Sequence, residues 1–181
     1  RNIRLRRYLF EQIRLSLLLK KYHLEAVHSL SYVTPLVTSI PSLVTIHDLN
    51  YEAFGHLMPL SKRLALSFFV SQSAKRANQI ITDSHFSRQE ILNTYQLEPH
   101  KVHVLYPGAP AEKLVDGRFP TISQELNIAP PYIIAFSSRT PNKNIHRLLQ
   151  AYQLMRLKYQ ITHQLVLVGH LPADLPPEIQ E

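Results

Sequence analysis

The chain has 181 residues and an apolar share of 45%, which is enough for a packed core and excludes an intrinsically disordered chain. It has no cysteine, which excludes disulfides and thiolate zinc sites and makes the reducing cytoplasm the expected location. The net charge of +7 predicts an anionic partner, such as a nucleotide, a membrane surface or a nucleic acid.

The first predicted element is a basic amphipathic helix at residues 1–23, where five Arg and two Lys alternate with Leu, Ile and Phe. This pattern is typical of a solvated helix face, and it also suits peripheral contact with the inner face of a membrane. No apolar run reaches the roughly 20 residues that span a bilayer. Nucleic acid is not an expected partner, because no aromatic residues form a stacking platform among the bases.

Strands and helices alternate through the rest of the chain. Predicted strands lie at residues 26–28, 42–49, 79–84, 101–108, 132–137 and 164–169, and predicted helices at 61–77, 87–95 and 144–158. Apolar strands separated by helices predict parallel sheets covered on both faces, in a doubly wound α/β fold. Residues 110–130 are rich in turn formers, so they predict a linker between two such units, at residues 1–109 and 131–181.

Polar residues follow the predicted strands, and ligands of open parallel sheets bind beyond these carboxyl ends. The strand-end residues are His47-Asp48, Thr82-Asp83-Ser84, Tyr106-Pro107-Gly108, Ser137-Ser138-Arg139 and Gly169-His170. With only four glycines, the sequence has no G-x-G-x-x-G and no Walker loop, and it also lacks H-E-x-x-H and G-x-S-x-G. The common dinucleotide, zinc-protease and hydrolase signatures are therefore excluded.

The start of the predicted helix at residues 144–158 has an unusual charge order. Lys143, His146 and Arg147 lie in its predicted first turn, Arg139 comes just before, and no acidic residue accompanies them. A helix N-terminus already carries partial positive charge, so bases there are unfavourable unless they are solvated or bind an anion. The residues themselves leave both explanations open.

Six segments, in this order, resemble the family 4 glycosyltransferases of GT-B fold, especially the bacterial mannosyl- and glucosyltransferases. They are HSLSYVTPL, TIHDLNY, IITDSHFSRQEIL, KVHVLYPG, YIIAFSSRTPNKNIHRLLQAY and LVLVGH. The likeness implies two facing Rossmann-like domains and transfer of a sugar from a nucleotide-diphospho-sugar donor to a sugar or lipid-linked glycan acceptor. It also implies retention of anomeric configuration, with no catalytic metal and no other cofactor.

The resemblance further implies roles for individual residues. Arg139 and Lys143 match the basic pair that grips the donor diphosphate. His47 matches the histidine that faces donor sugar and acceptor, and is the candidate catalytic residue. Gly169 matches the glycine where the chain passes close to the donor.

Other residues at the strand ends are secondary candidates. Asp48, Ser84 and Ser138 are candidates for the cleft, although Asp48 also suits a structural role that holds a loop or orients His47. Candidates for the border of the acceptor cleft are His28 and Tyr32.

Several nearby polar residues have local structural explanations instead. Ser87 with Glu90 fits a capping box at the start of a helix. Asn142 or Asn144 is expected to cap the helix at residues 144–158. His146 and Arg147 are expected to face solvent, because helix geometry does not aim every first-turn base at one ligand.

Two family features have no counterpart in the sequence: a Gly-rich loop after the first strand, and an E-x7-E segment near the C-terminus. The acids after Lys158 are Asp174, Glu178 and Glu181, at a different spacing. We therefore expect the central part of a longer enzyme, inactive alone, with Ile134, Leu149 and Val166 poorly covered. The alternatives are a GT-B-fold sugar-nucleotide epimerase and a truncated, non-catalytic chain that binds sugar nucleotides.

Overall fold

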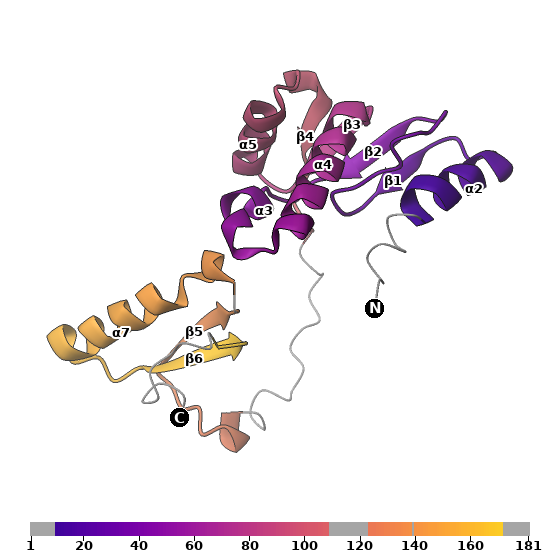
Figure 1. Ribbon diagram of the computed structural model, residues 1–181. Coiled ribbons are helices and arrows are strands. Elements are labelled where there is room, and N and C mark those ends of the chain that lie inside the picture. Colours follow the sequence, from indigo (N-terminus) through magenta and orange to yellow (C-terminus); the bar gives the residue numbers. More distant parts are fainter. Residues whose placement is uncertain (1–9, 109–122, 139, 172–181) are drawn as a thin grey trace. The chain divides into compact units, whose positions relative to one another are not determined.

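The computed structural model describes residues 10–108, 123–138 and 140–171 (Figure 1). The chain divides into two compact units, unit 1 at Arg1–Ala109 and unit 2 at Pro110–Glu181. Each unit contains its own parallel sheet, so the predicted α/β fold with parallel strands is confirmed.

Unit 1 is built on a four-stranded parallel sheet in the order β1-β2-β3-β4. Its strands are β1 (Val27–Ser29), β2 (Ser42–Thr45), β3 (Gln79–Thr82) and β4 (Val102–Val104). Its helices are η1 (Phe10–Arg14), α2 (Leu15–Lys21), α3 (Asn50–Ala53), η2 (Gly55–Leu57), α4 (Leu60–Arg76), α5 (His85–Tyr95) and η3 (Pro99–Lys101). The register pairs Val44 with Ile80 and Ile80 with Val102.

The core of unit 1 forms where apolar residues of the strands meet α4 and α5. Val44 and Ile80 of the sheet, Val70 of α4 and Ile91 of α5 are all fully buried in one cluster. Burial of side chains of this size contributes about 1.5–3 kcal/mol each relative to exposure. The carboxyl edge of the sheet is therefore held on a rigid base.

Three strands of unit 1 are shorter than predicted, among them the predicted strand at residues 101–108, which is observed as β4 at Val102–Val104. The predicted strand at residues 42–49 ends at Thr45, because the Asp48 side chain accepts a hydrogen bond from the Asn50 backbone at 3.0 Å and turns the chain into α3. The predicted strand at residues 79–84 ends at Thr82, because Ser84 is the N-cap of α5, which begins at His85. Asn and Asp side chains commonly end regular structure in this way.

The predicted basic N-terminal helix is confirmed for residues 10–21, and residues 1–9 lie outside the described residues. Leu19 is 4% exposed, whereas Leu17 is 66% exposed and Ile13 is 57% exposed. The segment therefore buries one apolar residue and presents others to solvent. In the part of the chain that the structure describes, every helix is too short or too polar to cross a bilayer.

Unit 2 has the two-stranded parallel sheet β5 (Tyr132–Ser137) and β6 (Gln164–Gly169), whose predicted bounds are confirmed. Between these strands the chain forms η4 (Pro141–Lys143) and α7 (Ile145–Tyr159). Ile145 and Leu149 of α7 are buried against partly buried leucines of the unit. The expectation that Leu149 is poorly covered is wrong, because α7 packs this residue inward, whereas Ile134 is 55% exposed as expected.

Gly169 has a structural function at the end of β6. Its φ of +125° is a conformation that L side chains rarely adopt, and a Cβ there would lie 2.1 Å from the Ser137 carbonyl oxygen. Only glycine allows the ends of β5 and β6 to approach so closely. Ser137 itself is buried, and its hydroxyl donates to the His170 carbonyl oxygen at 2.5 Å.

We predict that Gly169→Ala destabilises unit 2 by about 1–3 kcal/mol, the usual cost of a strained backbone conformation. The matched control is Gly108→Ala, because a Cβ there meets nothing within 4 Å. Amide hydrogen exchange of β5 and β6 measures the effect. Equal protection in both variants would contradict the close approach of the two strand ends.

Candidate functional site

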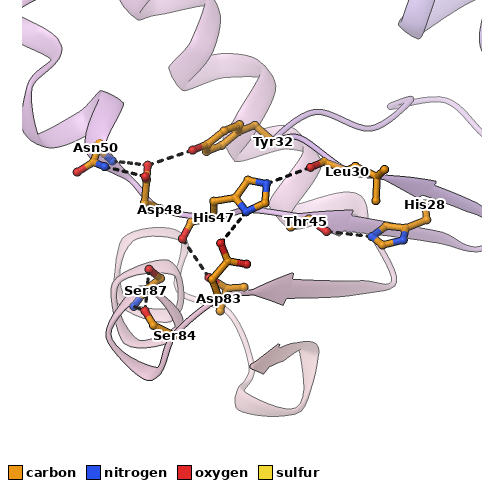
Figure 2. Close-up of polar contacts among 11 residues, drawn as sticks. His28, Leu30, Tyr32, Thr45, His47, Asp48, Asn50, Asp83, Ser84 and Ser87 are labelled. Carbon is orange, nitrogen blue, oxygen red and sulfur yellow. Dashed lines mark hydrogen bonds and ion pairs between the residues drawn. The ribbon is translucent and has the colours of Figure 1, made fainter. Parts of the chain in front are cut away.

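Polar groups that follow three neighbouring strands meet at the carboxyl edge of the sheet in unit 1 (Figure 2). Leu30 follows β1, His47 follows β2 and Asp83 follows β3. Parallel pairing sends all three strands out of the sheet at one edge, which is where open α/β sheets bind ligands. We refer to His47, Asp83 and the Leu30 carbonyl as the histidine cluster.

Both ring nitrogens of His47 have partners. Nδ1 lies 2.7 Å from Asp83 Oδ2, and Nε2 lies 3.1 Å from the Leu30 carbonyl oxygen. The side chains of His47 and Asp83 are 43% and 36% exposed. The Tyr32 ring stands edge-on to the imidazole, with ring centroids 5.8 Å apart. The predicted candidate His47 is thus a fixed side chain that remains open to solvent.

The hydrogen bond with Asp83 is the largest cause that raises the pKa of His47 above its ordinary value. Partial burial opposes this effect, while the Asp83 charge, the Leu30 carbonyl and the Asp48 charge each add to it. A raised pKa means that the interaction stabilises the fold below the pKa of unfolded histidine. That stability is lost as the pH rises through the folded pKa.

Asp48 follows His47 in the sequence, but its carboxylate bonds to Asn50 at the start of α3. Its Oδ1 accepts from the Asn50 backbone at 3.0 Å and from the Tyr32 hydroxyl at 3.1 Å, and its Oδ2 accepts from Asn50 Nδ2 at 2.6 Å. Of the two structural roles considered, these bonds favour the one that holds a loop. Burial and the Asp48 charge raise the pKa of Tyr32, so this phenol stays protonated as a donor.

Ser84 is the N-cap of α5, and its Oγ accepts from the Ser87 backbone at 3.1 Å. The predicted capping box of Ser87 with Glu90 is therefore wrong, because α5 begins two residues before Ser87. The hydroxyl of Ser84 also donates to Ser87 Oγ at 3.1 Å. The predicted cleft residue Ser84 thus uses its side chain to cap α5.

The predicted diphosphate site lies in unit 2. Lys143 ends η4 and is exposed, so it precedes α7, and its predicted position in the first turn of that helix is wrong. The helix starts later because Asn144 adopts the left-handed conformation with φ of 49°. The first turn of α7 contains no acid. Arg139 lies outside the described residues.

The loop before α7 is organised by short polar side chains. Ser138 Oγ and Thr140 Oγ1 lie 2.5 Å apart, and Thr140 Oγ1 also donates to Asn142 Oδ1 at 2.6 Å. Asn144 occupies the N-cap position of α7, which confirms one of the two expected caps, but its side chain makes no capping hydrogen bond. Asn142 instead stabilises the turn, and Asn144 supplies the backbone conformation at the helix start.

The sequence did not assign Asp83 a role, although it identified the strand end on which Asp83 lies. The available signal was that the predicted strands ending at His47 and at Asp83 belong to one predicted parallel sheet, whose carboxyl ends share one edge. Of the two residues considered for the acceptor cleft, Tyr32 lies against His47. His28 lies within β1, where its Nε2 is 2.9 Å from Thr45 Oγ1.

A pocket of about 410 Å³ lies beside α5 and β4, and no residue of the histidine cluster lines it. Arg88 forms part of its wall and donates to the carbonyl oxygens of Val102 and Pro99 at 2.8 and 2.7 Å. The remaining lining residues are His85, His100, His103, Val104 and Tyr106. Within the described ranges, His, Asp and Glu form no group of three or more that could hold a metal ion.

Two comparisons with known proteins bear on this site. The model of Glycosyltransferase Family 4 matches residues 2–113, which include the whole histidine cluster. The O-antigen chain mannosyltransferase B of Escherichia coli is 26% identical over 138 residues, which cover 71% of this chain and 35% of that protein. The chain thus spans about a third of the length of this relative.

We predict that Ser84→Ala lowers the stability of unit 1 by about 1 kcal/mol, the usual cost of losing an N-cap hydroxyl. The control is Glu90→Ala, which removes the acid of the incorrect capping box and leaves the cap intact. Thermal unfolding followed by circular dichroism compares the two variants. A larger loss of stability in Glu90→Ala than in Ser84→Ala would contradict the observed cap.

Proposed function

We propose, from the premise that the chain belongs to glycosyltransferase family 4, that it is part of an enzyme that transfers a hexose from a nucleotide-diphospho-sugar. The acceptor is a sugar or lipid-linked glycan, the anomeric configuration is retained and no metal is required. The name of the mannosyltransferase relative supports mannose as the transferred hexose. The observation that carries the proposal is the exposed Lys143, placed after β5 and just before the N-terminus of α7, whose first turn contains no acid.

Release of a nucleoside diphosphate leaves negative charge on the departing oxygen, which fixed donors and cations stabilise. After β5 the chain supplies exposed Lys143 and then the N-terminus of α7, whose first turn contains no acid. Arg139 adds a guanidinium in the same segment of sequence, suited to two parallel bonds with phosphate. Basic residues are unfavourable at the N-terminus of a helix without a ligand, because that end already carries partial positive charge. They become favourable when a diphosphate binds there.

The histidine cluster supports a second part of the proposal, in unit 1. His47 is exposed on one side and held by two bonds on the other. This geometry presents an imidazole in one orientation to the region where the fold binds ligands. We propose that His47 contacts the donor sugar and that Tyr32 borders the acceptor.

The 181-residue chain alone is proposed to bind the donor weakly and to transfer no sugar. Ile134, Phe136 and Val168 of the sheet in unit 2 are 55%, 71% and 42% exposed, so this sheet has one poorly covered apolar face. A layer with so little buried apolar area offsets its chain entropy poorly. Catalysis depends on positioned groups, which such a layer does not hold firmly.

The test is a transfer assay on the full-length protein with Lys143→Ala. We predict that the variant lowers turnover by about 10²–10³-fold, the scale for losing one donor to transition-state charge. The matched control is Lys158→Ala, which removes the same charge at the other end of α7. Turnover of Lys143→Ala near that of Lys158→Ala would remove the diphosphate assignment.

The same assay with a chelator tests the proposed metal independence, which predicts unchanged turnover. Loss of turnover in the chelator that is restored by magnesium or manganese would contradict it.

A further inference from the structure

The bonding partners of His47 determine its protonation state. Its Nδ1 lies 2.7 Å from a carboxylate oxygen of Asp83, and its Nε2 lies 3.1 Å from the Leu30 carbonyl oxygen. Both oxygens are acceptors. A neutral imidazole carries one N–H and one lone pair, whereas the imidazolium carries two N–H groups. Only the imidazolium satisfies both contacts.

We propose that Asp83 is a positioning residue that holds His47 as a fixed imidazolium, donating to Asp83 and to the Leu30 carbonyl. His47 then presents positive charge, and no proton-accepting nitrogen, to the ligand. The catalytic role of this imidazolium rests on the proposed function, because its charge faces the expected site of an anionic donor. The protonation state of His47 and its contact with Asp83 do not depend on that function.

The groups that surround the imidazole favour its charged form. Asp83 approaches from the end of β3, and Asp48 follows His47 itself. Tyr32, in the segment after β1, lies with its ring edge-on to the imidazole, and its hydroxyl donates to Asp48. The two carboxylates and the Leu30 carbonyl all raise the pKa of His47, against partial burial.

Deprotonation of His47 would have a structural cost. The proton removed leaves a lone pair that points either at Asp83 or at the Leu30 carbonyl, and two acceptors at these distances repel each other. A role for His47 as general base therefore requires that one of these contacts be broken first. Electrostatic stabilisation requires no such rearrangement.

The protonation state of His47 also determines how the segment after β1 is held. The bond from Nε2 to Leu30 O connects this segment to the end of β2, and the protonated ring also connects it to Asp83 at the end of β3. The Tyr32 backbone amide also donates to the Thr45 carbonyl at 2.8 Å. Loss of the proton from Nε2 would release the Leu30 carbonyl, while the bond from the Tyr32 amide to Thr45 persists.

The test is a pH titration of the ¹⁵N-labelled 181-residue chain by NMR, in which ring nitrogen shifts report each protonation state. We expect both nitrogens of His47 to be protonated at neutral pH, where a neutral imidazole would show one protonated and one bare nitrogen. A single-tautomer neutral ring at pH 7 overturns the proposal. This result depends on neither a variant nor a ligand.

The role of Asp83 is tested by Asp83→Asn, which keeps the shape of the side chain and removes its charge. The titration of His47 should move to lower pH, and the signal of the Ser31 amide, which shares a peptide group with the Leu30 carbonyl, should shift with it. The matched control is Glu98→Gln, which removes a carboxylate before β4, at the opposite edge of the sheet. An Asp83→Asn titration that coincides with that of Glu98→Gln overturns the positioning role.

The same variants in the full-length protein separate this proposal from the proposed function. If the protein transfers sugar, the high-pH limb of the kcat profile should move to lower pH in Asp83→Asn and stay in place in Glu98→Gln. An unmoved limb in Asp83→Asn overturns the catalytic meaning of the imidazolium. Absence of transfer in the unaltered protein would overturn the proposed function and leave the NMR result standing.

Discussion

Parallel pairing of β1, β2 and β3 is the constraint on which the site in unit 1 depends. It brings His47 to a carbonyl 17 positions before it and to a carboxylate 36 positions after it. The pairing is itself fixed by burial, because Val44 and Ile80 oppose each other in register and neither is exposed to solvent. A slip of one residue would turn these side chains out of the core and move His47 away from Asp83. Stability and site geometry therefore have the same origin.

The two units position a basic side chain at their strand ends in different ways. In unit 1 the His47 cation is held by bonds to Asp83 and Leu30, so its position is fixed and its charge depends on its neighbours. In unit 2 Lys143 is exposed, and the N-terminus of α7 adds partial charge from backbone groups. A fixed cation suits contact with one sugar position, whereas a mobile lysine suits a flexible diphosphate.

Much of this arrangement could be predicted from sequence. Apolar runs bounded by turn formers predicted β5 and β6 to the residue, and the strand ends pointed to His47. Side-chain contacts were harder to predict, because periodicity predicts which face a residue occupies but not which neighbour it contacts. The capping error has a similar cause: Ser84 and Ser87 are both suitable caps, and Glu90 made the wrong one look stronger. Lys143 was misplaced because the left-handed conformation of Asn144 delays α7.

The central claim is that carboxyl ends of parallel strands in this chain carry the groups that bind an anionic sugar donor. Amide chemical-shift mapping of the ¹⁵N-labelled chain, titrated with GDP and separately with UDP, tests it most directly, because the method detects weak binding. The account predicts that the largest shifts fall on Ser138, Lys143 and the first turn of α7. Shifts confined to the pocket beside α5 and β4, or no shifts at millimolar nucleotide, would contradict it.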